Sequence, residues 1–363
     1  MILVAKIGTS SVTGADGSVD ARAVARLCAE VASVRARGHR CVVVTSGAVT
    51  AGVAALRPPG GRPSDATTLQ ALSSIGQHRL MHVYDEAFAR EGIIAGQVLL
   101  APLDFGERRQ YLHARATLAR LLELGVVPVV NENDAIADDE IRFGDNDRLA
   151  ALVANLVGAD VLVLLTDTAG LFTADPRIDA AASLVEEVSE IDAELELAAG
   201  GPGSPGGSGG MASKLAAARM AAWSGVRTVI ASAAREGVLA GALASEPGIG
   251  TSIAARARTI GARKLWIAFA RPPSGRIVVD DGARRALVER EASLLAAGVR
   301  SVEGEFAVDD AVEIVGPDGT VFAKGLAGLS SRRSSTWVGR NSRDLPADLS
   351  REVVHRDDLV VLV

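Results

Sequence analysis

Residues 2–11 read ILVAKIGTSS, a run of apolar residues that passes into a polar loop with a glycine. Apolar runs that repeat along a chain, separated by helical stretches, are typical of a mostly parallel sheet covered on both faces. This pattern predicts strands at 2–7, 41–45, 93–100, 126–130, 161–166 and 227–231, and helices at 20–37, 66–90, 110–123, 147–156 and 211–224. The sequence therefore predicts an α/β fold in which helices sandwich the sheet.

The character of the sequence changes after Pro272-Pro273. Short apolar runs follow, separated by the turn pairs Ser274-Gly275, Asp281-Gly282 and Asp318-Gly319, which indicates a small β-rich module. A chain of 363 residues also exceeds the usual size of a single core, so two domains are expected. We predict an α/β domain over 1–262, a linker over 263–272 and a β-rich domain over 273–363.

The charge of the chain argues against a protein whose main function is to grip nucleic acid. The formal net charge is −6, and the segment 273–363 carries 12 basic and 15 acidic residues. Binding to a phosphate backbone requires a concentrated basic face. RNA binding by the C-terminal module is disfavoured for the same reason.

The two cysteines, Cys28 and Cys41, lie in a predicted helix and a predicted strand, with no C-x-x-C pair and no Cys/His cluster. Neither a disulfide framework nor a zinc site is indicated, and a reducing compartment fits best. The sequence enters a strand directly, without the pattern of a secretory leader. No apolar run approaches the roughly 20 residues of a membrane helix. We expect a cytoplasmic protein that does not enter the membrane.

Lysine is scarce, since only four of the 38 basic residues are lysines. Two of them, Lys6 and Lys214, stand in glycine-containing loops that precede predicted helices. A compact ammonium on a flexible stem suits a position beside a phosphate. The two loop lysines are therefore candidate phosphate ligands.

Polar loops follow the first two predicted strands, one around Gly8 and one at Thr45-Ser46-Gly47. Ligands of open α/β sheets bind at the carboxyl ends of the strands, where these loops are expected. Glycine lets backbone N–H groups approach an anion, and a following helix N-terminus adds partial positive charge. The alternative is that Gly8 and Gly47 form ordinary turns.

Two further clusters of carboxylates and amides, 131–134 (NEND) and 144–147 (GDND), adjoin apolar elements on the same expected rim of the sheet. They are suited to hold the ammonium and carboxylate of an amino acid, or to position Mg²⁺ and the lysines. The alternative is a pair of solvated turns with helix caps.

The most glycine-rich segment, 200–210 (GGPGSPGGSGG), leads directly into Lys214 and a predicted helix. Its G-x-G-x-x-G match follows a helix rather than a strand, so it is not a dinucleotide fingerprint, and it is not a P-loop. A loop that covers phosphates fits better than a flexible linker, because it adjoins one of only four lysines.

Together, these loops resemble the amino acid kinase family. The matching motifs span most of the chain: Lys6-Ile7-Gly8-Thr9-Ser10, Val44-Thr45-Ser46-Gly47-Ala48, Gly76-Gln77, Asn131-Glu132-Asn133-Asp134, Gly144-Asp145-Asn146-Asp147, Leu165-Thr166-Asp167, Gly170-Leu171-Phe172-Thr173-Ala174-Asp175-Pro176-Arg177 and Gly209-Gly210-Met211-Ala212-Ser213-Lys214. The C-terminal module is similar to a PUA domain through Gly298-Val299, Phe306, Asp310-Ala311-Val312 and Lys324-Gly325.

The resemblance is to the members that phosphorylate L-glutamate, and it implies the first step of proline biosynthesis. In that reaction the γ-phosphoryl group of ATP, bound with Mg²⁺, passes to the side-chain carboxylate of L-glutamate and gives L-glutamyl 5-phosphate. A carboxylate with a pKa of about 4.3 is already ionised at neutral pH, so no general base is required. Catalysis then consists of positioning and charge neutralisation.

The resemblance also assigns roles to residues. Lys6 and Lys214 would stabilise the transferring phosphoryl group, and Asp147 would hold both ammonium groups. The glutamate-binding positions are Ser46, Asp134 and Asn146. The nucleotide-binding positions are Lys6, Gly8, Thr166, Asp167, Ser208, Gly209, Gly210, Met211, Ala212, Ser213 and Lys214. Protein ligands for Mg²⁺ are not assigned.

Two features depart from the family pattern. Ser208 stands where many relatives carry Thr, and residues 326–330 (LAGLS) lack the Asn-Tyr-Ser run often found in the PUA domain. The resemblance further implies inhibition by proline and a homodimer or homotetramer, for which the 66–90 helix is either an interface or part of the core.

Two alternative functions stay open. One is a sibling kinase that acts on N-acetylglutamate, aspartate, carbamate or UMP, against which the PUA-like module and the 131–134 cluster count. The other is an RNA-binding protein with an inactive kinase fold, against which the acidic C-terminal module counts.

Overall fold

The computed structural model describes residues 1–101, 103–136, 146–174, 179, 181–191, 195, 210–257, 259–271, 273–340 and 352–362. Within these ranges the chain forms two compact units, Met1–Ile260 and Gly261–Val363.

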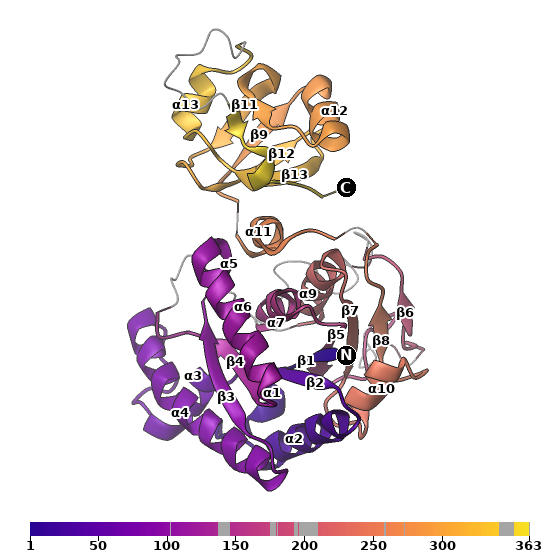
Figure 1. Cartoon of the computed structure of the whole chain (residues 1–363). Coiled ribbons are helices and arrows are strands. Elements are labelled where there is room, and N and C mark those ends of the chain that lie inside the picture. The colour runs from indigo at the N-terminus through magenta and orange to yellow at the C-terminus, as the bar shows by residue number, and fades with distance from the viewer. Residues whose placement is uncertain are drawn as a thin grey trace. The chain divides into compact units, whose positions relative to one another are not determined.

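The first unit is built on an eight-stranded sheet (Figure 1). Its strands in chain order are β1 (Ile2–Ile7), β2 (Arg40–Val44), β3 (Ala95–Leu100), β4 (Val127–Glu132), β5 (Val161–Thr166), β6 (Glu187–Val188), β7 (Arg227–Ser232) and β8 (Thr251–Ile253). Their spatial order is β3-β4-β2-β1-β5-β7-β8-β6, and all neighbouring pairs are parallel except β7 with β8. The predicted fold class is confirmed.

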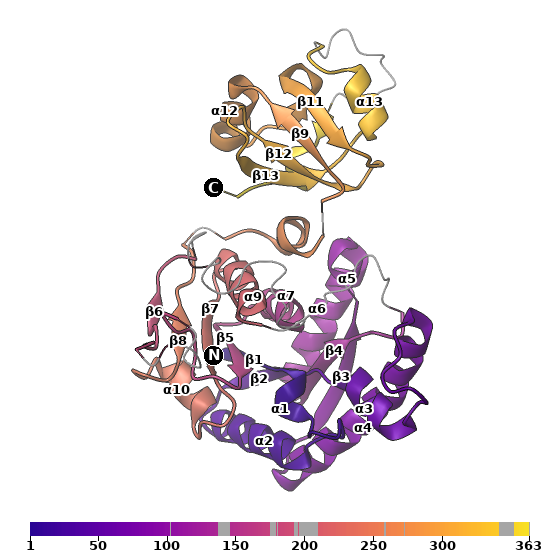
Figure 2. The same ribbon diagram turned by 180° about the vertical axis from the view of Figure 1, so that it is seen from behind.

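Helices cover both faces of this sheet, and the view from behind shows the same two layers (Figure 2). One face packs against α6 (Arg108–Glu123), α7 (Asn146–Val157) and α9 (Met211–Trp223). The other packs against α2 (Ala21–Ala36), α4 (Ala66–Arg90) and α10 (Val238–Ala244). The remaining helices are α1 (Thr9–Val12), α3 (Ala48–Leu56) and α5 (Leu103–Gly106).

The central strands are formed by residues that suit burial on both faces. All six residues of β1 are buried, as are all six of β5, and the two strands pair directly. Helices α2 and α4, which cover the same face of the sheet, each begin after an aspartate that caps the helix. The Asp20 carboxylate accepts from the N–H groups of Arg22 and Ala23, and the Asp65 carboxylate accepts from that of Thr68. These caps satisfy N–H groups that have no partner within a helix, so they fix where α2 and α4 begin.

Helices α3 and α4 approach each other unusually closely because of two glycines. A Cβ atom at Gly52 would lie 1.9 Å from the carbonyl oxygen of Leu72, and one at Gly76 would lie 1.8 Å from that of Ala48. Any side chain at either position would push the two backbones apart. The contact holds α4 against α3, which begins at Ala48, directly after the polar loop at Ser46.

The second unit combines a five-stranded sheet of order β11-β9-β12-β13-β15 with the two-stranded pair β10-β14. The strands are β9 (Gly275–Val279), β10 (Leu294–Leu295), β11 (Val299–Gly304), β12 (Ala311–Val315), β13 (Val321–Leu326), β14 (Glu352–Val354) and β15 (Leu359–Val361). Its helices are α11 (Ala262–Leu265), α12 (Asp281–Arg290) and α13 (Ser331–Thr336), with a π-helix at Trp266–Ala270 and short 3-10 turns at Ala296–Gly298 and Arg356–Asp358.

Two details of this unit differ from expectation. The segment 263–272, predicted as a linker, contains most of α11 and the π-helix. The buried Lys324 ammonium binds the backbone carbonyls of Ala268 and Arg271 at the end of that π-helix. The turn predicted at Asp281-Gly282 is wrong, because these residues begin α12. Asp280 caps that helix by accepting from the N–H of Ala283 at 2.7 Å.

Both cysteines are buried free thiols in the first unit. Burial raises the pKa of Cys28 and of Cys41 to about 12. In the described part of the chain, none of the helices has the length and apolar character needed to cross a bilayer.

Candidate active site

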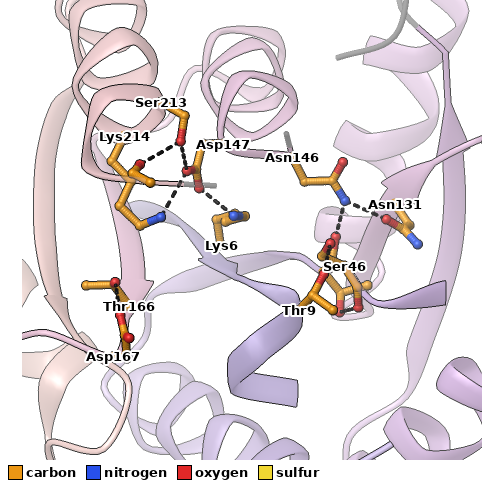
Figure 3. Close-up of polar contacts among 12 residues, drawn as sticks. Lys6, Thr9, Ser46, Asn131, Asn146, Asp147, Thr166, Asp167, Ser213 and Lys214 are labelled. Carbon is orange, nitrogen blue, oxygen red and sulfur yellow. Dashed lines mark hydrogen bonds and ion pairs between the residues drawn. The ribbon is translucent and has the colours of Figure 1, made fainter. Parts of the chain in front are cut away.

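The predicted site residues meet along the edge of the first sheet where its parallel strands end. Lys6 lies near the end of β1, Ser46 follows β2, Asn131 lies near the end of β4, and Thr166 ends β5. Helices α7 and α9 begin at the same edge with Asn146-Asp147 and with Ser213-Lys214 in their first turns (Figure 3). The site therefore follows from the parallel topology, which gathers segments distant in the sequence.

One half of the site is a buried cluster of charges. The Asp147 carboxylate is fully buried; its Oδ1 lies 2.5 Å from Lys6 Nζ, and its Oδ2 lies 3.2 Å from Lys214 Nζ. Lys6 and Lys214 are only 3% and 5% exposed. The two lysines that the sequence singled out thus converge on one carboxylate (Figure 3).

Among the described contacts, this cluster pairs two positive charges with one negative charge. Two ammonium groups face a single carboxylate, and burial of an ion costs several kcal/mol unless it is paired. Asp147 pairs with both lysines but offsets only one of their two charges. An arrangement of this kind is suited to receive an anion, which would supply the charge that Asp147 does not.

The start of α9 adds polar groups to the same cluster. Ser213 Oγ donates to Asp147 Oδ2 at 3.1 Å or to the carbonyl oxygen of Gly210 at 2.8 Å. The first turn of α9 contains no acidic residue, and Gly210 at its N-cap provides no side chain to cap it. The first N–H groups of a helix lack partners within the helix and carry partial positive charge. They reinforce the preference for an anion.

The other half of the site is a cluster of neutral amides and hydroxyls. Asn146 Nδ2 donates to the carbonyl oxygen of Thr45 at 2.5 Å and to Asn131 Oδ1 at 2.7 Å. Asn131 Nδ2 donates in turn to Gln77 Oε1 at 2.7 Å. The Thr45 hydroxyl lies 2.9 Å from that of Tyr84, and this hydrogen bond holds Thr45 in place. Burial raises the pKa of Tyr84.

Hydroxyls and a carboxylate border these amides. Ser46 Oγ lies 2.8 Å from Thr9 Oγ1, which connects the loops after β1 and β2. Gly47, directly after Ser46, has φ = 99°, a conformation that side chains other than glycine's rarely adopt. Asp134 accepts a hydrogen bond from Ser73 of α4 at 2.8 Å. These groups offer both donors and acceptors, as recognition of an amino acid requires.

The nucleotide-binding positions predicted after β5 lie beside the charged half. The Thr166 hydroxyl donates to Asp167 Oδ1 at 3.0 Å, and the carbonyl oxygen of Thr166 accepts from the N–H of Ala233, which follows β7 (Figure 3). Gly8 lies directly after β1, and a Cβ atom there would lie 3.7 Å from Lys6 Nζ. Gly8, Thr166 and Asp167 therefore line the same sheet edge as the two lysines.

Some predicted positions fall outside the described residues. These are Ser208 and Gly209 of the glycine-rich segment, Gly144 and Asp145 of the second cluster, and 175–177. Of the others, the structure brings Lys6, Asp147, Ser213 and Lys214 into one cluster and places Ser46 and Asn146 in the other.

Sequence reasoning placed Thr9, Thr45 and Gln77 in motifs without giving them individual roles, and it missed Ser73. Gln77 follows the glycine at the α3–α4 contact, and a polar side chain beside a glycine in a helix was the available signal. Among the described residues no group of three His, Cys, Asp or Glu side chains forms a metal site.

Comparisons with known proteins agree with this geometry. The model of the amino acid kinase family matches residues 1–232, and that of the PUA domain matches residues 275–346. The chain is 48% identical to a glutamate 5-kinase of Frankia casuarinae, over 99% of this chain and 96% of that protein. It is 46% identical to one of Nocardia farcinica and 43% identical to one of Pelobacter propionicus, with coverage of at least 96% in both directions.

These relatives confirm the resemblance that the loop motifs indicated, including the PUA domain at the C-terminal end. The match extends over both compact units rather than over the kinase motifs alone. The chain therefore belongs to the amino acid kinase family.

Proposed function

We propose that this protein catalyses ATP-dependent phosphorylation of the side-chain carboxylate of L-glutamate, as its glutamate 5-kinase relatives are named for. The observation that carries the proposal is the pair of buried ammonium groups on Asp147, next to a cluster of amides and hydroxyls. The first half suits a phosphoryl group and the second suits an amino acid, so the two substrates would meet between them.

The residues present fit the triphosphate of ATP. Lys6, Gly8 and the backbone from Gly210 to Lys214 would hold the phosphates, and Thr166 with Asp167 would lie toward the rest of the nucleotide. A Cβ atom at Gly210 would meet no atom of the described residues within 4 Å. Mg²⁺, bound to the phosphate oxygens, would neutralise part of their charge and favour in-line transfer.

L-Glutamate would bind at Ser46, Asp134 and Asn146. The Asp134 carboxylate and the Asn146 carbonyl oxygen would accept from its ammonium group, and the Ser46 hydroxyl would donate to a carboxylate. The reacting carboxylate is already ionised at neutral pH, so the protein does not need to remove a proton. None of the five histidines lies in the loops that form the site.

Lys6 and Lys214 would stabilise the negative charge on the phosphoryl oxygens during transfer. Asp147 would position both ammonium groups, and Ser213 would hold Asp147 by its 3.1 Å hydrogen bond. Groups fixed in advance in a buried site stabilise a transition state without the cost of reorganising at the moment of reaction.

Further parts of the proposal follow the same family. We propose a cytoplasmic enzyme of proline biosynthesis, assembled as a dimer or tetramer and inhibited by proline.

The experiment that tests the reaction measures ATP consumption with Mg²⁺ on L-glutamate, N-acetyl-L-glutamate, L-aspartate and UMP. Hydroxylamine is present to trap an acyl phosphate as a hydroxamate. Hydroxamate from L-glutamate alone is the expected result. Turnover of a different substrate, or of none, would overturn the proposal.

A further inference from the structure

The amide half of the site continues into the middle of α4, beyond the residues assigned to substrate. Gln77 projects from α4 toward β4 and is only 7% exposed. Its Oε1 accepts a hydrogen bond from Asn131 Nδ2 at 2.7 Å. The preceding residue, Gly76, allows α4 to lie against α3 at this point. Gln77 is thus held at the site by the close contact of two helices.

The hydrogen bond from Asn131 to Gln77 is one of three contacts that hold the Asn131 amide in one orientation. With its Nδ2 on Gln77, Asn131 presents Oδ1 to two donors, Asn146 Nδ2 at 2.7 Å and its neighbour's backbone N–H at 2.9 Å. A flipped Asn131 would set its NH₂ group against both donors and its oxygen against the oxygen of Gln77. Both donors would lose their acceptor, and the contact with Gln77 would survive only if the Gln77 amide turned as well.

The orientation of Asn131 fixes that of Asn146 in the same way. Both N–H bonds of the Asn146 amide are used, one by Asn131 Oδ1 and one by the carbonyl oxygen of Thr45. Only Oδ1 of Asn146 is left to accept a hydrogen bond, and it points away from these two partners (Figure 3). An ammonium group requires such an acceptor, whereas a flipped Asn146 would present a donor to it.

Gln77 is not the residue that stability alone would favour at this position. Its Nε2 is buried and has no hydrogen-bond partner among the described residues. A buried N–H group without a partner costs folding free energy; an apolar side chain of similar size would avoid that cost but would leave the buried Asn131 Nδ2 without its acceptor. The oxygen of Gln77 accepts the hydrogen bond from Asn131, whereas its nitrogen, unpartnered in the described part of the chain, lowers the folding free energy that the side chain contributes.

We propose that Gln77 is a positioning residue for the amino-acid substrate. It acts through Asn131 to hold the Asn146 oxygen toward the substrate ammonium. The inference rests on the proposed function, because it takes L-glutamate as the ligand of Asn146. It adds a residue in α4 that is not expected to touch either substrate.

The test compares Gln77→Met, which keeps the length but removes the acceptor, with Gln77→Glu, which keeps an acceptor oxygen. Gln77→Met should raise KM for L-glutamate about tenfold or more, while kcat and KM for ATP change less than about twofold. Its melting temperature should change little, because the Gln77 N–H group, unpartnered within the described ranges, is removed while Asn131 Nδ2 loses its acceptor. Gln77→Glu should keep KM for L-glutamate within about threefold of the unsubstituted protein. Gln97→Met, on the exposed side of β3, is the matched control.

A second pair of variants separates positioning from general packing. Asn131→Asp has oxygens on both sides and so offers Asn146 an acceptor in either orientation. In the Asn131→Asp background, Gln77→Met should therefore no longer raise KM for L-glutamate. An equal rise in both backgrounds would overturn the proposal.

The outcomes also separate this inference from the proposed function. Absence of hydroxamate from L-glutamate with the unsubstituted protein would overturn both. Normal activity combined with an unchanged KM in Gln77→Met, or with a tenfold rise in Gln77→Glu, would overturn only the role of Gln77. A rise in KM for both L-glutamate and ATP, together with a lower melting temperature, would identify Gln77 as a structural residue. That result would also overturn the positioning role.

Discussion

The charged half and the amide half of the site are both built on buried side chains, but they would act on the substrates in different ways. The charged half holds two lysines on Asp147, and its contribution depends on how much charge is present. The amide half holds Asn131 and Asn146, and its contribution depends on which atom of each amide faces the substrate. A change of one charge should therefore damage the first half, and a change of orientation should damage the second. The variants below test that division.

The largest effect is expected from removal of one ammonium group. Lys6→Ala or Lys214→Ala should reduce kcat by about 10²–10³, the usual consequence of losing one group that stabilises transition-state charge. The free energy of unfolding should change little, because Asp147 keeps the other lysine as its partner. Turnover and urea unfolding of the same preparations measure the two effects.

Lys264→Ala is the control for these variants, since Lys264 is half-buried and belongs to the second unit, which contributes none of the strands that form the site. It should leave kcat unchanged. Unchanged turnover in both Lys6→Ala and Lys214→Ala would remove the charged half from the mechanism.

Asp147→Asn should act mainly on stability. The substitution keeps the size of the side chain but removes the counter-charge that two buried ammonium groups share. Breaking a buried ion pair in this way costs about 3–5 kcal/mol. Because a bound anion would replace the missing charge, the loss should shrink when ATP is added. Unfolding in urea with and without ATP measures both parts.

Asp160→Asn is the matched control for this change, because Asp160 is exposed and lies before β5, at the opposite edge of the sheet. Asp160→Asn should lower the free energy of unfolding far less, and its effect should be the same with and without ATP. Equal losses in the two variants would argue that the charge of Asp147 has no special role.

Ser46→Ala tests the amide half with a smaller change. It removes the hydroxyl that lies 2.8 Å from Thr9 and leaves the charged half intact. One hydrogen bond contributes about 0.5–1.5 kcal/mol, so KM for L-glutamate should rise about three- to tenfold with KM for ATP unchanged. Ser74→Ala, on the exposed side of α4, should change neither constant. A rise in KM for ATP would contradict the division of the site.

The last prediction concerns the pH dependence of stability that arises from two thiols in the hydrophobic core of the first unit. Burial raises the pKa of Cys28 and Cys41 from an ordinary value of 9.0 to about 12, so the folded protein keeps the proton that the unfolded chain loses above pH 9. The stability from each thiol is full below pH 9 and is lost as pH rises toward 12, by up to about 1.4 kcal/mol per pH unit.

The Cys28→Ala/Cys41→Ala variant should therefore lose less unfolding free energy between pH 9 and pH 10 than the unsubstituted protein. Urea unfolding at several pH values provides the comparison. The same slope in both proteins would show that the thiols are not protected by burial.

Much of the first unit could be predicted from sequence because its signals are local. The apolar run 161–166 became β5 with those bounds, and the pattern at 66–90 became α4 with those bounds. Lys6 and Lys214 could be named because scarce lysines stand out along the chain, and Asp147 because the resemblance to the family assigned it to both ammonium groups. Their convergence followed from the rule that parallel strands end at one edge.

The remainder depends on contacts that no local pattern records. Helix α3 reads AVTAGVAAL, almost entirely small and apolar, so it lacks the polar face that gives a helix its 3.6-residue period. Gln77 belongs to the amide half only because Gly52 and Gly76 bring α3 and α4 together. The charged half was thus visible in the sequence, whereas the residues that orient the amides were visible only in the structure.

The scarcity of lysine has a practical consequence for chemical labelling. Three of the four lysine side chains are buried, two on Asp147 and the third, Lys324, on backbone carbonyls of the second unit. Amine-selective acylating reagents should therefore modify the exposed N-terminal amine and Lys264 first and should reach Lys6 and Lys214 only when the site opens. Peptide mapping after brief acylation would then report the opening of the site directly, against a nearly silent lysine background.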